Sequence, residues 1–477
     1  MKPASFPDPA ANAYQQIRIA HWDAIARKHN SWHGLGAWYH RRLEEIYLFY
    51  VGPNQNILEI GCAEGDLLAS LKPAHGVGID FSEEMICCAK ERHPELEFLH
   101  ADAHDLSALN EKFDVIILSD LVNDLWDVQQ VFEQIRPLCA SHTRVLLNFY
   151  SRLWQFPLSL ARKLNLATSN LYQNWLTRED VNALLLLANF ETIRVIQEVL
   201  WPLPLGGFAN RFLVRLWPFP EMALSNFVIA RPAPERAREP VVSIIVPARN
   251  ESGNIKAIFE RTPQMGRATE LVFVEGHSKD DTYAAIEREI AAHPATPSLL
   301  LRQTGIGKAD AVRLGFSKAR GDVLMILDAD LTVPPEDLPR FYEALVSGKG
   351  EFINGVRLVY PMEKEAMQSL NFLGNKFFSM AFSWLLGQPI KDTLCGTKVL
   401  WKRDYEQIAA NRSYFGDFDP FGDYDLIFGA AKLNRKIIDL PIRYRERTYG
   451  STNISRWRHG LLLLRMVTFA ARRIKFV

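Results

Sequence analysis

The stretch NILEIGCAEGDLLASLK, residues 56–72, decides the fold of the first half of the chain. Residues 56–60 have the largely apolar character of a buried parallel strand, and Leu67–Lys72 has the pattern of a helix. Between them, Gly61 lets the backbone turn tightly and Gly65 lets a ligand approach closely. A strand, a glycine turn and a helix in this order predict a nucleotide-binding α/β unit.

Polar residues follow the later strands of this half. We predict these strands at Gly76–Ile79, Glu97–His100, Val115–Ser119 and Arg144–Asn148. Asp80 comes roughly 20 residues after the glycine turn, where a carboxylate can accept both hydroxyl hydrogens of a ribose. Asp102 and Ala103 follow the next strand and are placed to meet the edge of an adenine ring.

The fourth strand leads into Asp120, Asn123 and Asp124, at the edge where an acceptor must lie. These residues could orient or deprotonate a sugar hydroxyl, or they could be turn and helix-cap residues. The sequence leaves both interpretations open. We expect residues 151–229 to form the lid and the closing strands of the same domain.

The chain of 477 residues is long for a single core. Residues 231–240 read RPAPERAREP, whose prolines and alternating charges are typical of a linker. The same alternation of strand, turn and helix begins again after it. We therefore expect an α/β protein of two domains, residues 1–230 and 241–477, joined by the linker 231–240.

In the second half, we predict strands at Val242–Val246, Glu270–Val274, Leu299–Arg302 and Val323–Leu327. The last strand ends in Asp328-Ala329-Asp330. Two carboxylates with this spacing can hold a divalent cation that bridges phosphates. The sequence therefore predicts a site for a metal ion and a diphosphate at the end of this strand.

Residues 56–148 resemble the class I S-adenosylmethionine-dependent methyltransferases, which have a Rossmann-like fold. The resemblance implies that S-adenosylmethionine lies on Glu59, Gly61, Gly65, Asp80, Asp102 and Ala103. Glu59 and Gly61 would approach its methionine portion. A dinucleotide-binding domain is the alternative, but such a site favours three glycines and this turn has two.

The second half, from Val241 to about Asn453, resembles the inverting family-2 glycosyltransferases of the Rossmann-like GT-A fold, and within them the dolichyl-phosphate mannose synthase-like branch. The resemblance implies a nucleotide-sugar donor and a polyprenyl phosphate or glycan acceptor. It also implies that the donor is held by Pro247, Arg249, Glu251, Glu275, Asp280, Lys308, Asp328, Arg357 and Arg447. Asp328 and Asp330 would hold Mg²⁺ or Mn²⁺ on the diphosphate, while Arg357 and Arg447 would clamp phosphate.

Two features of the second half leave alternatives open. The usual Asp-Asp-Gly-Ser is Glu275-Gly276-His277-Ser278 here, which leaves the base open between uracil and guanine. Asp423 takes roughly the position of the family's catalytic carboxylate, which a hydroxyl acceptor needs to remove its proton. It could also be a helix-start carboxylate. A phosphate acceptor is already an anion and needs no such base.

Charge and apolar patterning bear on partners and location. Lys+Arg and Asp+Glu both total 55, so no basic field favours nucleic acid. The five cysteines lack zinc-ligand spacing and a disulfide framework, and the N-terminus lacks a secretory signal, so we expect a cytoplasmic protein. Leu370–Ile390 and His459–Val477 are apolar stretches interrupted by charge, which suits peripheral contact with the inner face of the membrane, although core packing is the alternative. Nothing in the sequence indicates the oligomeric state.

These observations favour a bifunctional enzyme of cell-surface glycan or glycolipid synthesis. One half would transfer a sugar to a polyprenyl-phosphate-type acceptor, and the other would methylate an intermediate of the same pathway. One alternative is a glycosyltransferase that acts on a polysaccharide hydroxyl. In a second alternative, the methyltransferase-like half is a scaffold or an S-adenosylmethionine sensor.

Overall fold

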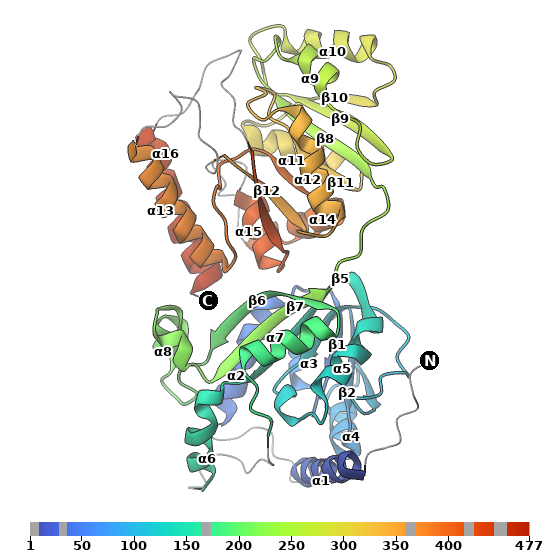
Figure 1. Cartoon of the computed structure of the whole chain (residues 1–477), viewed down its shortest axis with the longest axis vertical. Helices are drawn as coiled ribbons and strands as arrows, with labels where there is room; N and C mark the ends of the chain where they lie inside the picture. The colour runs from blue at the N-terminus through green and yellow to red at the C-terminus, as the bar shows by residue number, and fades with distance from the viewer. Residues whose placement is uncertain are drawn as a thin grey trace. The chain divides into compact units, whose positions relative to one another are not determined.

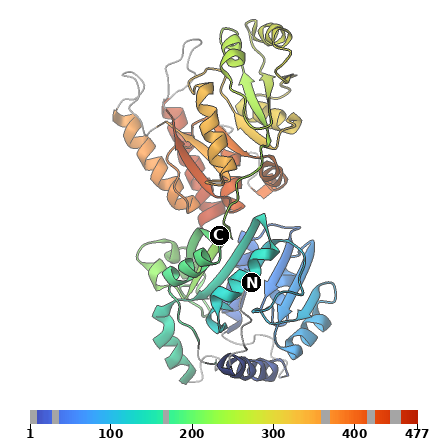
Figure 2. The same ribbon diagram turned by 45° about the vertical axis from the view of Figure 1, so that its right-hand side comes forward.

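The computed structural model describes residues 9–27, 36–163, 171, 173–357, 369–414, 424–442 and 456–476. The chain divides into two compact units, Met1–Ala233 and Pro234–Lys475. Each unit contains a seven-stranded sheet. Figures 1 and 2 show helices packed on the sheet of each unit. The α/β class with two domains that the sequence predicts is confirmed.

The first sheet has the order β3-β2-β1-β4-β5-β7-β6, and β7 alone runs against its neighbours. Its strands are β1 (Asn56–Ile60), β2 (His75–Asp80), β3 (Glu97–His100), β4 (Phe113–Leu118), β5 (Cys139–Tyr150), β6 (Phe190–Glu198) and β7 (Ser225–Pro232). Because β1 to β5 are parallel, their carboxyl ends meet at one edge, which is where the predicted cofactor residues lie.

Helices cover both faces of this sheet. Leu58 and Ile60 of β1 join one apolar core, whereas Ile57 joins the other, which explains the apolar run at the start of the quoted stretch. The helices are α1 (Pro9–Ala26), α2 (Gly36–Tyr50), α3 (Asp66–Ser70), α4 (Glu83–Arg92), η1 (Val122–Asp124), α5 (Val128–Ile135), η2 (Arg136–Leu138), η3 (Arg152–Trp154), α6 (Gln155–Lys163), α7 (Arg178–Leu187), α8 (Gly207–Arg211), η4 (Leu213–Arg215) and η5 (Phe219–Met222).

The second sheet has the order β10-β9-β8-β11-β13-β12-β14, in which β13 is antiparallel to both of its neighbours. Its strands are β8 (Val241–Ala248), β9 (Ala268–Glu275), β10 (Ser298–Arg302), β11 (Val323–Ile326), β12 (Phe352–Val356), β13 (Lys398–Trp401) and β14 (Ile437–Pro441). All nine strands predicted from the sequence are present, with ends that differ by a few residues. The sequence did not predict β12 to β14.

The helices of the second unit include a pair, α13 and α16, that lie side by side (Figure 1). Among the described residues, no helix is both long and apolar enough to cross a membrane. The helices of this unit are α9 (Ile255–Arg261), α10 (Thr282–Ala292), α11 (Lys308–Lys318), η6 (Pro335–Asp337), α12 (Leu338–Val346), α13 (Ser369–Leu386), α14 (Lys402–Ala410), η7 (Arg412–Tyr414), α15 (Tyr424–Lys432), α16 (Arg456–Ala470) and η8 (Ala471–Lys475).

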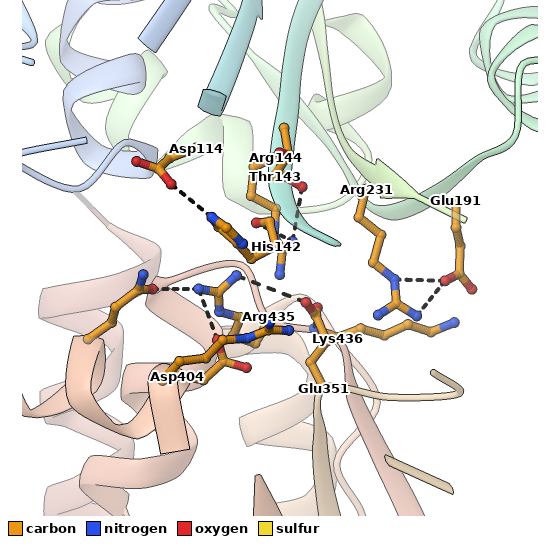
Figure 3. Close-up of polar contacts among 12 residues, drawn as sticks. Asp114, His142, Thr143, Arg144, Glu191, Arg231, Glu351, Asp404, Arg435 and Lys436 are labelled. Carbon is orange, nitrogen blue, oxygen red and sulfur yellow. Dashed lines mark hydrogen bonds and ion pairs between the residues drawn. The ribbon is translucent and has the colours of Figure 1, made fainter. Parts of the chain in front are cut away.

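A buried charge cluster fixes one end of the second sheet, as Figure 3 shows. The Arg435 guanidinium lies 3.1 Å from Asp404, at the start of α14, and 4.0 Å from Glu351, just before β12. Glu351 also accepts the backbone N–H of Lys436 at 3.0 Å. Glu351 directly precedes β12, and Arg435 and Lys436 directly precede β14. The cluster therefore aligns two strands that are far apart in the sequence.

Candidate active sites

The glycine turn after β1 is held by a carboxylate at the end of β2. Gly61 and Gly65 have φ angles of 74° and 79°, in the left-handed region that favours glycine. The two oxygens of Asp80 accept the backbone N–H groups of Ala63 and Ser82, at 3.0 and 2.9 Å. The structure therefore brings the predicted ribose carboxylate directly against the predicted turn, and each oxygen keeps a lone pair for a further donor.

Glu59 lies in β1 beside this turn and is 3% exposed. Burial raises the pKa of its carboxyl to about 8, with Asp80 and Asp66 adding to the effect, while a backbone N–H lowers it. Within the described part of the chain, its buried Oε2 accepts no hydrogen bond. A buried carboxyl oxygen without a donor suits a cationic group of a ligand, because a nearby positive charge would favour the ionised form.

Asp102 and Ala103 follow β3, as predicted, but helix α1 contacts the carboxylate. Asp102 Oδ1 accepts the backbone N–H and the ring Nδ1 of His104, and its Oδ2 accepts the side-chain amide of Gln15 at 2.7 Å. Burial raises the pKa of Asp102, but the bonds from His104 outweigh it and the pKa lies below its usual value. Ala103 is buried. An adenine amino group at Asp102 would therefore share or replace the contact with Gln15.

The three polar residues after β4 prove to differ in role. Asn123 is buried, and both ends of its side-chain amide are hydrogen-bonded. The amide nitrogen donates to the backbone oxygen of Asn174, and the amide oxygen accepts the backbone N–H of Tyr150. Asp124 lies 3.5 Å from the Arg18 guanidinium of α1. No side chain caps η1, so the helix-cap interpretation fails for Asp120. Asp120 instead accepts hydrogen bonds from α2 and β5, which are described below.

In the second unit, hydrogen bonds from polar side chains hold the loops after β8 and β9. Asp280 accepts the backbone N–H and the hydroxyl of Thr282 through Oδ1. Its Oδ2 accepts the backbone N–H of Ser252 at 3.3 Å. Glu275 accepts the backbone N–H of Ser278 at 2.5 Å, and Glu251 accepts the amide of Asn254 at 2.8 Å. The predicted nucleotide residues thus lie on neighbouring strand ends, where they also shape the loops.

Pro247 and Arg249 flank the end of β8. Pro247 pairs with Val274 of the neighbouring strand, and the Arg249 side chain is exposed. Both residues therefore lie at the carboxyl edge of the sheet, where the sequence places them.

Lys308 and Asp328 form an ion pair at the end of β11, with Nζ 2.6 Å from Oδ1. Burial raises the pKa of Asp328, but Lys308, Lys398 and Arg357 more than offset it, so the carboxyl stays ionised well into the acid range. The backbone of Gly396 lies against this pair: a Cβ there would be 1.9 Å from Asp328 Oδ2 and 2.3 Å from Lys308 Nζ. Sequence reasoning missed Gly396.

Asp330 is 8% exposed, and its Oδ1 accepts the backbone N–H and hydroxyl of Thr332 at 3.1 and 2.7 Å. Among the described residues, no group of three His, Cys, Asp or Glu side chains could hold a metal ion. The two aspartates could still hold an ion whose other ligands are phosphate oxygens and water, as Mg²⁺ commonly is.

Arg357 follows β12, and its guanidinium forms a fork with Asp392. The distances from Nε to Oδ2 and from Nη2 to Oδ1 are 2.7 and 3.0 Å. Two parallel bonds of this kind fix the orientation of the arginine. Asp392 was not predicted, and a lone aspartate 35 residues away gives no sequence signal. Asp423 and Arg447 lie outside the described residues, so their roles stay predictions.

Comparison with known proteins agrees with this division. Residues 57–142 match the family described as Methyltransferase domain, and residues 243–408 match Glycosyl transferase family 2. Dolichol-phosphate mannosyltransferase of Saccharomyces cerevisiae is 36% identical over 108 residues, which are 22% of this chain and 40% of the relative. Undecaprenyl-phosphate 4-deoxy-4-formamido-L-arabinose transferase of Pseudomonas aeruginosa is 34% identical over 236 residues, which are 48% of this chain and 64% of the relative.

The enzyme of the same name from Klebsiella pneumoniae subsp. pneumoniae is 24% identical over 231 residues, which are 48% of this chain and 66% of the relative. The chain thus spans between 40% and 66% of the length of these curated relatives. Two separate family matches fall on the two structural units. The chain is therefore a fusion of a methyltransferase domain with a family-2 glycosyltransferase domain.

Proposed function

We propose that the chain is a bifunctional enzyme of cell-surface glycan or glycolipid synthesis. The glycosyltransferase domain transfers a sugar, with inversion, from a nucleotide-sugar to a polyprenyl phosphate. The methyltransferase domain transfers a methyl group from S-adenosylmethionine to an intermediate of the same pathway. The observation that carries the proposal is the gathering of charged residues at the carboxyl edge of each sheet, Glu59 with Asp80 in one and Lys308 with Asp328 in the other.

The donor's diphosphate would bind beside the Lys308–Asp328 ion pair. The Lys308 ammonium supplies positive charge to the phosphates, and the short contact with Asp328 keeps it in place. Asp328 and Asp330 would hold Mg²⁺ or Mn²⁺, which neutralises the charge that develops on the leaving diphosphate. The nearby cations Lys398 and Arg357 keep Asp328 ionised, as a metal ligand must be.

Two features of the second unit bear on the identity of the acceptor, the Arg357 guanidinium and an apolar surface. The relatives named above act, by name, on dolichol phosphate and undecaprenyl phosphate. The fork with Asp392 presents the Arg357 guanidinium in one orientation, which suits an anionic headgroup. A polyprenyl phosphate brings its own negative charge, so no residue need remove a proton from it.

The apolar surface is formed by α13 and α16. Its exposed large side chains are Phe377, Met380, Trp384, Leu461 and Leu464. The Lys475 ammonium lies 5.1 Å from the centre of a Trp384 ring, so a cation accompanies the aromatic group. Apolar side chains with aromatic rings and cations at their margin suit the headgroup boundary of a membrane. We infer that this pair rests on the inner face of the cytoplasmic membrane, where the lipid acceptor is present.

The methyltransferase site fits S-adenosylmethionine through its carboxylates. The ammonium of the methionine portion would meet the buried Oε2 of Glu59 and restore the charge that burial opposes. The ribose hydroxyls would donate to Asp80, and the adenine amino group would donate to Asp102. The ammonium, the two ribose hydroxyls and the adenine amino group of the ligand therefore match acceptors that the fold already presents at one edge.

Mass spectrometry of lipid products tests the proposal. Detergent-solubilised polyprenyl phosphate is incubated with the full chain, a divalent cation and a panel of nucleotide-sugars. We expect the lipid to gain the mass of one sugar residue with a particular donor, and we expect the Asp330→Ala variant to give no such product. Transfer of sugar to a polysaccharide hydroxyl, with none to the lipid phosphate, would overturn the acceptor and favour the alternative in which Asp423 is essential.

A further inference from the structure

Asp120, just after the end of β4, has a left-handed backbone conformation, which is uncommon for a residue other than glycine. Its φ is 53°, in the left-handed region. Asn148 of β5 holds it from two sides: the amide nitrogen donates to Asp120 Oδ1 at 2.5 Å, and the amide oxygen accepts the Asp120 backbone N–H at 3.2 Å. Asn148 therefore holds both the backbone and the side chain of Asp120.

A buried network fixes the Asp120 carboxyl through one oxygen. The Tyr39 hydroxyl of α2 donates to Oδ1 at 2.8 Å and lies 3.0 Å from the Ser225 hydroxyl. Tyr47 donates in turn to the oxygen of Asn148 at 2.7 Å. Within the described residues, Asp120 Oδ2 accepts no hydrogen bond, and the side chain is only half-buried. One oxygen is therefore clamped, while the other accepts no hydrogen bond from the described residues.

Asp120 lies at the edge where the methyl donor is proposed to bind. β4 is the parallel neighbour of β1, and Ile117 pairs with Glu59. The residue after Asp120, Leu121, packs so closely on the glycine turn that a Cβ on Gly61 would be 2.9 Å from its side chain. Asp120 is thus at the same strand edge as the groups that would hold S-adenosylmethionine.

A purely structural role explains this arrangement less well. A neutral amide would accept the same two hydrogen bonds, yet the chain places a carboxyl where burial raises its pKa to about 7. The bonds from Tyr39 and Asn148 lower that pKa, and the charge of Asp124 in η1 raises it. Tyr47 of α2 also faces the group, with its own pKa raised by burial. A carboxyl poised near neutral pH suits proton transfer.

We propose that Asp120 is the general base of the methyl-transfer site and that the group it serves is a hydroxyl. This inference rests on the proposed methyl transfer from S-adenosylmethionine. The acceptor oxygen forms a bond to the methyl carbon, and the carbon–sulfur bond breaks with its electron pair going to sulfur. The hydroxyl proton moves to Asp120 Oδ2. A sugar hydroxyl is the acceptor class that fits the pathway, since a neutral hydroxyl must lose its proton in this step.

The test compares Asp120→Asn with wild type in the full chain. Asparagine keeps the size of the side chain and an oxygen for Tyr39 and Asn148, but it cannot take the proton. We expect S-adenosylmethionine affinity, measured by titration calorimetry, to change less than about threefold. With deuteromethyl S-adenosylmethionine and a panel of sugar hydroxyls that includes the lipid-linked product of the chain itself, we expect the rate to fall ~10²- to 10⁴-fold.

The pH dependence separates a base from an anchor. In wild type, the methylation rate should rise with pH up to about 7 and then level off, because the base acts when ionised. In Asp124→Asn the midpoint of this rise should move to lower pH, because the charge that raises the Asp120 pKa is gone. A full rate in Asp120→Asn, or methyl transfer to no hydroxyl of the panel, overturns the inference.

A readout without an acceptor completes the test. Since the folded pKa of Asp120 is raised, the wild type loses stability as pH rises from about 4 to about 7, and Asp120→Asn does not. The melting temperature of the variant relative to wild type should therefore increase between pH 5 and pH 8. A constant difference contradicts the inference. Failure of wild type to bind S-adenosylmethionine is a separate result that contradicts the proposed function itself.

Discussion

Replacing Gly396 with alanine should damage glycosyl transfer while leaving the fold intact. The φ of Gly396 is outside the left-handed region, so alanine meets no backbone strain there. Its Cβ, however, would be 1.9 Å from Asp328 Oδ2 and 2.3 Å from Lys308 Nζ, where contacts below 3.0 Å essentially never occur. The carboxylate oxygen must retreat by about 1 Å, and the ion pair must open.

The magnitude follows from that displacement. A ~1 Å misplacement in a catalytic site can cost ~10²-fold in rate. Both clashing atoms are at the ends of side chains that can rotate, so we expect the free energy of unfolding to fall by at most ~1 kcal/mol, below the usual cost of overpacking. That corresponds to a fall of ~2–4 °C in melting temperature for a domain of this size.

The assay follows sugar transfer to polyprenyl phosphate together with nucleotide-sugar affinity and thermal unfolding. Gly207→Ala is a matched control, because no atom lies within 4 Å of a Cβ at that position and its φ is ordinary. The control should transfer sugar at the wild-type rate. Wild-type transfer by Gly396→Ala would refute the reasoning, because it would mean that the Lys308–Asp328 pair is not part of the reacting site.

Three further predictions concern the metal, the acceptor and the contact between Gln15 and Asp102. Excess EDTA should abolish glycosyl transfer, and added Mg²⁺ or Mn²⁺ should restore it. Full activity in EDTA would refute a metal role for Asp328 and Asp330. With a polyprenyl phosphate acceptor, Arg447→Ala should lose more rate than Asp423→Asn, since a charge-assisted contact is worth roughly 1.5–3 kcal/mol; the reverse order in a rate assay indicates a hydroxyl acceptor. Gln15→Ala should bind S-adenosylmethionine at least as tightly as wild type by calorimetry, because it removes the donor that competes for Asp102, and a large loss of affinity contradicts that competition.

The strands and the polar residues at their ends could be predicted because both depend on local patterns. Apolar runs indicate buried parallel strands, and parallel strands bring their carboxyl ends to one edge, so Asp80 and Asp328 could be placed before the structure was seen. Contacts between distant segments could not be predicted. Gln15 reaches Asp102 from a helix 87 residues away, and nothing in its own neighbourhood indicates this.

Gly396 escaped prediction for a different reason. A glycine that is needed for space, with an ordinary φ, carries none of the turn signals that identified Gly61. The sequence leaves the role of Asp120 open because that role depends on Tyr39 and Asn148, which the fold supplies from another helix and another strand. Polar networks of this kind are properties of tertiary packing and not of sequence spacing.

The central claim is that one chain carries two separate transferase sites, and ligand binding tests it most directly. S-adenosylmethionine and a nucleotide-sugar with divalent cation are each titrated into wild type, Asp80→Ala and Asp330→Ala. We predict that wild type binds both, that Asp80→Ala loses only S-adenosylmethionine, and that Asp330→Ala loses only the nucleotide-sugar. Failure of wild type to bind either ligand, or loss of both ligands in a folded single variant, would contradict the account.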